Sequence, residues 1–90
     1  MVTVTDQAAE VLRTTLDEAR TEPGQALRLL PRPGGGFGLG LDAEREGDEV
    51  VTADGEKILL MTPDIAEALG EATIDAPETE EGRKLVISRR

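Results

Sequence analysis

A glycine-rich run, Gly34–Gly40, is the segment of this chain whose composition most strongly suggests a binding loop. It reads GGGFGLG and contains the only phenylalanine of the chain. Glycine loses more backbone freedom on folding than any other residue, so a dense run is typical of positive φ angles or of close approach to another group. The candidate binding residues are the start of this run and the first carboxylate after it: Gly34, Gly35, Gly36, Phe37, Gly38 and Asp42.

Phosphate binding is the first chemistry that such a loop suggests, but the spacing does not match. A Walker loop requires a lysine after its last glycine, and none follows this run. The dinucleotide pattern requires glycine at its sixth position, which is Leu39 when counted from Gly34 and Leu41 when counted from Gly36. The run also precedes a predicted strand, so no helix N-terminus follows it to receive an anion. The favoured interpretation is a structural bend or bulge.

The acidic stretch after the run imitates the beginning of a calcium-binding loop. Asp42, Glu44 and Glu46 alternate along the chain, and Gly47 takes the sixth place. The twelfth place of such a loop holds a bidentate glutamate, but here it is Ala53. The pattern therefore favours a solvated acidic connection over a metal site.

Side chains that could act in catalysis are scarce. The sequence has no cysteine and no histidine, and its only serine, Ser88, lacks a base to activate it. Among 19 acidic residues in 90, chance pairs of carboxylates are expected, and no pair is distinguished by its spacing. We therefore expect a protein that is not an enzyme, with no metal site and no bound cofactor.

The charge balance excludes some classes of partner. The net charge of −9 disfavours nucleic acids and anionic membrane surfaces, because both are bound through lysine and arginine. No apolar stretch approaches the roughly 20 residues of a membrane span, and the first residues lack the pattern of a signal peptide. The sequence predicts a cytoplasmic protein whose partner is another protein or a second copy of itself.

An amphipathic helix is predicted near the start of the chain. Thr5 has the character of an N-cap, and Pro23-Gly24 ends the segment. Apolar residues recur between them at helical spacing: Ala8, Ala9, Leu12, Leu16 and Ala19. This stripe is expected to pack on the rest of the domain.

Short strands dominate the remainder of the chain. Residues 27–29 alternate as in a half-buried strand, and residues 37–41 place glycine on one face, which predicts that another backbone packs closely there. Asp54-Gly55 predicts a hairpin between residues 49–53 and 56–61. A short helix is expected between Thr62 and Gly70. The last elements are predicted as a strand at 72–75, an acidic turn at 77–82 and a strand at 85–88.

This order of elements predicts a single α+β domain that spans residues 1–90. One long helix precedes several short strands, which favours a curled, mostly antiparallel, sandwich-like β-structure with the first helix packed on it and one short second helix. Helices do not alternate with the strands, as a doubly wound parallel sheet would require.

Several segments together resemble the HesB/IscA-type family, the A-type iron–sulfur carriers. Met1–Ala9 is similar to the family's Thr-rich strand and helix start, Gly36–Leu41 is similar to its G-F-x-Y-G-L segment, and Asp54–Asp64 is similar to its D-G-V-K-V-L-V-D-P hairpin. The resemblance covers essentially all 90 residues through the order of several moderate motifs. It implies the compact, curled HesB-like fold.

The resemblance also shows where this chain departs from the family. Counted back from Gly36-Phe37, Gly34 occupies the position of the first cluster-binding cysteine, and the expected C-G-C segment after residues 85–88 is missing. The resemblance therefore implies a degenerate member that acts in iron–sulfur cluster biogenesis through protein contacts, without ligating a cluster. The alternative is a module that binds a small molecule or metal ion through Gly34–Gly40 and nearby carboxylates.

Overall fold

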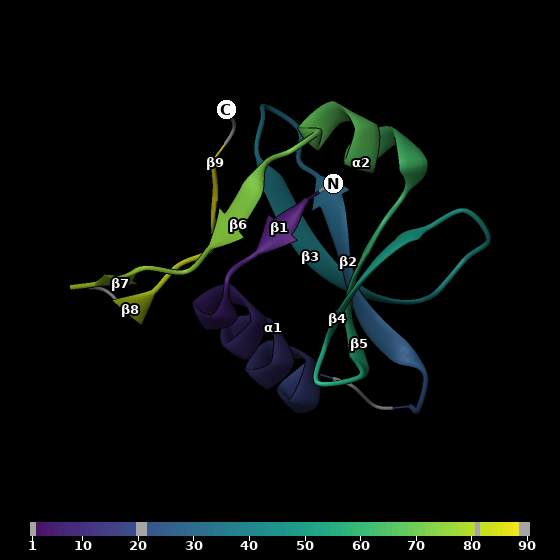
Figure 1. The fold of residues 1–90 in the computed structure, drawn as a ribbon, viewed down its shortest axis with the longest axis horizontal. Coiled ribbons are helices and arrows are strands. Elements are labelled where there is room, and N and C mark those ends of the chain that lie inside the picture. Colours follow the sequence, from purple (N-terminus) through teal and green to yellow (C-terminus); the bar gives the residue numbers. More distant parts are fainter. Residues whose placement is uncertain (1, 20–21, 81, 89–90) are drawn as a thin grey trace.

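The computed structural model describes residues 2–19, 22–80 and 82–88. These residues form helices and short strands, and the strands are arranged in two main sheets and a small hairpin (Figure 1). In chain order the elements are β1 (Thr3–Val4), α1 (Asp6–Ala19), β2 (Gln25–Pro31), β3 (Phe37–Ala43), β4 (Glu49–Ala53), β5 (Glu56–Met61), α2 (Pro63–Leu69), β6 (Thr73–Asp75), β7 (Glu78–Thr79), β8 (Gly82–Arg83) and β9 (Val86–Ser88). This α+β arrangement confirms the predicted fold class.

Helix α1 begins where the sequence predicts. The backbone N–H of Ala8 donates to the Thr5 hydroxyl at 3.2 Å, so Thr5 is its N-cap. Ala8, Leu12 and Leu16 are buried, which confirms most of the predicted apolar stripe. Ala19 is exposed, so the buried stripe ends one turn earlier than predicted.

The larger sheet has the strand order β3-β2-β5-β4. Strand β2 is antiparallel to β3 and parallel to β5, and β4 and β5 form the predicted hairpin with bounds 49–53 and 56–61. Asp54 and Gly55 have φ angles of 53° and 79°, as a turn with two left-handed central residues requires. The register of β2 and β3 places Pro31 opposite Phe37, at the end of β2 where the glycine run begins.

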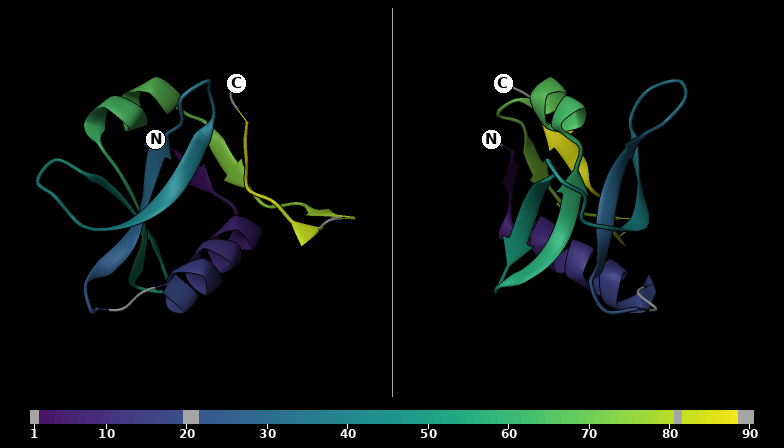
Figure 2. Two further views of the ribbon diagram at one scale, coloured as in Figure 1. Left: turned by 180° about the vertical axis from the view of Figure 1, so that it is seen from behind. Right: turned by 90° about the vertical axis from the view of Figure 1, so that its right-hand side faces the viewer.

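The smaller sheet has the order β1-β6-β9 and forms the second layer (Figure 2). Helix α1 packs on β2, β5 and β6, and therefore contacts both sheets. Strand β5 lies inside the molecule: all four residues Ile58–Met61 are buried. The second helix, α2, is preceded by Thr62, has Pro63 in its first turn and ends at Gly70, as predicted.

Two predictions for the strands are wrong in detail. Residues 77–82 are not only a turn, because β7 and β8 pair as a small antiparallel hairpin with Thr79 opposite Gly82. Two-residue strands are too short to show any apolar alternation, so the sequence pattern could not indicate them. Strand β2 is not half-buried either: residues 26–29 are all buried, including Arg28.

Candidate binding site at the β2–β3 hairpin

The glycine run forms the turn between β2 and β3. The backbone N–H of Arg32 donates to the carbonyl of Gly36 at 3.0 Å, and the N–H of Gly35 donates to the carbonyl of Arg32 at 3.1 Å. Gly34, Gly35 and Gly36 have φ angles of 86°, 110° and 76°. Such angles strain residues that carry a Cβ atom, so the run supplies a conformation that other residues adopt only at a cost.

Crowding does not explain these three glycines. A Cβ atom built on Gly34, Gly35 or Gly36 meets no atom within 4 Å, and all three residues are exposed. The turn therefore stands in solvent, and its backbone angles alone account for glycine there.

The glycines inside β3 have a different role from the one predicted. A Cβ atom on Gly38 would lie 2.9 Å from Nε of Arg32, and one on Gly40 would lie 3.1 Å from Cδ1 of Leu30. The close neighbours are thus side chains of β2, and the predicted close approach of another backbone is wrong. Because Gly38 and Gly40 have no side chains, the side chains of Leu30 and Arg32 can lie across the outer face of β3.

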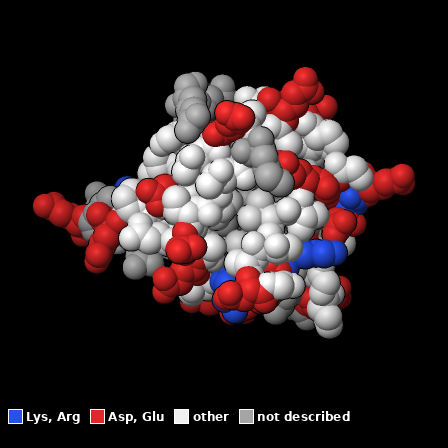
Figure 3. Space-filling model, viewed as in Figure 1, with Lys and Arg blue, Asp and Glu red and all other residues white. Residues whose placement is uncertain are grey.

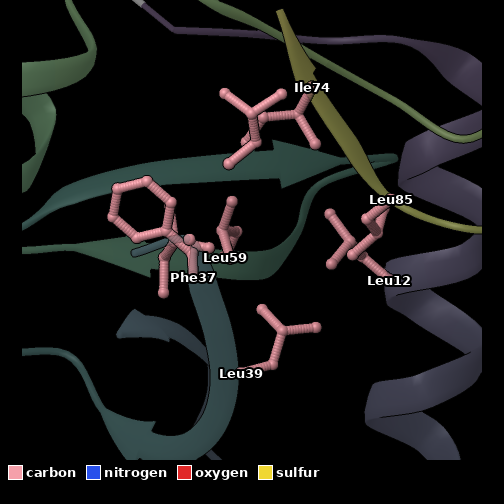
Figure 4. Close-up of a pocket in the computed structure, with 9 residues that line it drawn as sticks. Leu12, Phe37, Leu39, Leu59, Ile74 and Leu85 are labelled. Atoms are coloured by element: carbon pink, nitrogen blue, oxygen red, sulfur yellow. The ribbon is translucent and has the colours of Figure 1, made fainter. Parts of the chain in front are cut away.

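The opposite face of β3 borders an apolar pocket of about 350 Å³ between the two sheets and α1. Figure 4 draws its lining residues, and six of them are labelled. They come from α1, β3, β5, β6 and the segment before β9: Leu12, Phe37, Leu39, Leu59, Ile74 and Leu85. Gly36 also lines the pocket, so two residues of the candidate loop, Gly36 and Phe37, reach it.

Asp42 does not join this group. It lies at the far end of β3, five residues from Phe37, or about 17 Å along an extended strand. Its carboxylate accepts a hydrogen bond from Nε of Arg28 at 2.8 Å and also lies 3.0 Å from Arg45. The structure therefore does not bring Asp42 together with the glycine turn.

Arg28 is the centre of a buried ionic network that the sequence did not indicate. Its Nη2 donates to Asp48 at 2.6 Å and its Nη1 to the same carboxylate at 3.2 Å. The side chains of Arg28 and Asp48 are only 5% and 2% exposed. The connection between β3 and β4 folds over the outer face of β2 and places Asp48 there, so it covers an arginine and is not simply a solvated loop.

The network lowers the pKa of both carboxylates, Asp42 and Asp48. The hydrogen bond from Arg28 lowers the pKa of Asp48, and the backbone N–H of Arg45 adds to this effect at 2.7 Å. The backbone N–H of Ala43 lowers the pKa of Asp42, with a further contribution from Arg28. Both groups are therefore held as anions that satisfy a buried cation, a structural role.

Within the described ranges 2–19, 22–80 and 82–88, no three acidic side chains converge where they could hold a metal ion. Glu44, part of the calcium-like pattern, pairs with Lys57 at 2.5 Å. Figure 3 shows acidic side chains spread around one face of the molecule. The same part of the chain has no helix with the length and apolar character of a membrane span.

The sequence patterns did not indicate the buried pair of Arg28 and Asp48, nor that Leu12 and Leu85 line a pocket. The alternation of Leu27, Arg28 and Leu29 is typical of a strand with one buried face, and it predicted that Arg28 lies on the solvent-exposed face. The available signal was weak: Leu27–Leu30 holds three leucines around one arginine, a pattern that also fits a strand covered on both faces.

Comparison with known proteins identifies the fold. No family model and no curated protein matches the sequence. Escherichia coli SufA, described as involved in biosynthesis of iron–sulfur clusters, superimposes with a TM-score of 0.75 at 21% identity over 98% of this chain and 84% of SufA. An Aquifex aeolicus protein gives 0.70 at 29% identity over 99% and 91% of the two chains. IscA with a [2Fe–2S] cluster gives 0.63 at 19% identity over 99% and 85%.

Proposed function

Because this chain is a HesB/IscA-type protein by its fold and has no cysteine, we propose that it takes part in iron–sulfur cluster biogenesis through contact with another protein, without ligating a cluster. One observation carries the proposal: the β2–β3 hairpin is intact, yet Gly34 stands where the family resemblance places the first cysteine. The proposed activity includes no catalytic step.

The residues of the chain do not fit an iron–sulfur cluster. Clusters are held by cysteine thiolates, in some cases with histidine. Neither residue type is present in the 90 residues, and Gly34 offers no side-chain donor. The nearest acid along β3, Asp42, is already bound to Arg28. Cluster ligation would need donors from another molecule.

The outer side of β3 supports the part of the proposal that concerns protein contact. Strand β3 is at the edge of its sheet and pairs with β2 alone among the described residues, so one row of its backbone groups is open to another strand. Leu30 lies across the glycine face of β3 and is 44% exposed. An open edge beside an exposed leucine suits addition of a strand from a protein partner or from a second copy.

The absence of cluster ligation is tested by anaerobic reconstitution with iron and sulfide. We expect the desalted protein to show no visible absorption of a bound cluster and no more iron than a cysteine-free control protein, because thiolate donors are lacking. Absorption spectra and iron analysis make the measurement. A stable cluster at one per chain or one per dimer would contradict the proposal.

The contact surface is tested with Leu30→Lys. The charge on the outer face of the β2–β3 hairpin, beside the open edge of β3, is expected to abolish self-association in sedimentation, or to abolish retention of iron–sulfur assembly proteins by the tagged chain. Val86→Lys is the matched control, because Val86 is 42% exposed but lies on the smaller sheet. The proposal fails if the wild-type chain is monomeric and retains none of these proteins, or if both variants behave alike.

A further inference from the structure

We propose that the apolar pocket between the two sheets binds a small uncharged apolar molecule. Its inner surface is formed by Leu12, Leu59 and Ile74, which are at most 2% exposed. Phe37 and Leu39 of β3 form its outer wall, and Leu39 is 36% exposed, so the pocket reaches solvent at this side. The site does not depend on the proposed role in cluster biogenesis.

The lining decides the chemical class of the ligand. It consists of leucine, isoleucine and phenylalanine side chains with one glycine. No lining side chain can donate or accept a hydrogen bond, so only backbone groups contribute polar surface to the pocket. A polar group buried without a partner costs free energy, so polar ligands are disfavoured and hydrocarbon-like ligands are favoured.

The charge of the protein separates uncharged ligands from anionic ones. The lining contains no lysine or arginine, and the chain carries a net charge of −9. A carboxylate or sulfonate placed in the pocket would lose its hydration without gaining a cation. An uncharged molecule has no such charge to desolvate and needs no cation. The pocket should therefore bind an uncharged molecule in preference to an anion of the same carbon skeleton.

The size of the pocket suits a compact molecule. Its volume of about 350 Å³ lies at the lower end of the range for ligand pockets, roughly 300–1,000 Å³. A smaller apolar cavity, of about 150 Å³, is enough to hold benzene. The space here therefore suits a molecule of a few rings, and the side chains around it in Figure 4 offer apolar contact on several sides.

Two probes with one scaffold test the proposal. N-phenyl-1-naphthylamine is uncharged, and 8-anilino-1-naphthalenesulfonate carries the same rings with a sulfonate. Titrated into the wild-type protein, the uncharged probe should give a saturable rise in fluorescence with one site per chain. The sulfonate should bind at least about tenfold more weakly, because its charge finds no partner.

Methyl NMR spectra of the wild-type protein locate the probe. The methyl signals of Leu12, Leu59 and Ile74 should shift on addition of the uncharged probe, whereas those of Leu30 on the outer face should not. Leu85→Trp adds bulk at the pocket and should abolish binding. Val86→Trp is the matched control, because its side chain is 42% exposed and does not line the pocket.

Each outcome decides the proposal. Saturable binding of the uncharged probe with shifts of the pocket methyls supports it, and does so even if Leu85→Trp fails to fold. Absence of saturable binding, or equal binding of both probes, overturns it. Shifts of the same methyls with protein concentration alone would mean that a second copy fills the pocket, and would also overturn it. Cluster reconstitution reports on none of these signals, so the two proposals fail separately.

Discussion

Replacement of Arg28 by methionine is expected to lower the free energy of unfolding by about 3–5 kcal/mol, the usual effect of leaving a buried ion without its partner. Asp48 is 2% exposed and receives two hydrogen bonds from Arg28. Once the guanidinium is absent, that carboxylate loses both of these hydrogen bonds and keeps the one from the backbone N–H of Arg45, at 2.7 Å. The midpoint of urea unfolding at pH 7 measures the change.

Arg13→Met is the matched control for this experiment. Arg13 also forms an ion pair at 2.7 Å, with Asp54, but the two side chains are 40% and 81% exposed. Water screens such pairs, so the control should change the unfolding free energy by about 1 kcal/mol or less. Equal effects of the two substitutions would show that Arg28 does not act through burial. Arg28→Met combined with Asp48→Asn should recover part of the loss, because the orphaned charge is also removed.

Leu16→Ala is expected to cost about 2–5 kcal/mol, the range found when a buried leucine is truncated. Leu16 is fully buried on the face of α1 that packs on the sheets, so its loss removes apolar contacts and leaves a cavity. Total stabilities of small domains are about 5–15 kcal/mol, so this one change is a large fraction. The unfolding midpoint in urea or on heating measures it.

Leu30→Ala is the comparison for Leu16→Ala. Leu30 is 44% exposed, so its truncation removes little buried apolar surface and opens no buried cavity. A change within about 0.5 kcal/mol is expected, as for other surface positions. If Leu16→Ala were equally mild, α1 would not be packed as the structure describes.

The sequence predicted those elements that depend on residues close together in the chain. Asp54-Gly55 predicted a hairpin with its bounds because both turn residues favour positive φ. Thr5 predicted the start of α1 because its hydroxyl accepts the N–H of Ala8 within the same turn. The glycines at 34–36 indicated a turn for the same reason. The short hairpin of β7 and β8 has no such signal.

The candidate site was predictable only in part. The glycine turn, Gly36 and Phe37 were indicated by composition, and the last two do line the pocket. Asp42 was grouped with them because it is near in sequence, but an extended strand separates them and Arg28 holds its carboxylate. Leu12 and Leu85 meet at the pocket from positions 73 residues apart in the chain, and no spacing rule relates them.

The sequence by itself determined which metal-ligating groups the protein can offer. Without cysteine or histidine, no fold of these residues can provide a thiolate or imidazole donor, and Gly34 can only shape a turn. Tertiary structure decided which polar and apolar groups are buried. Burial depends on what covers a residue, and the segments that cover Arg28 and that enclose the pocket come from distant parts of the chain. A buried cation and an apolar pocket therefore became visible only in the folded molecule.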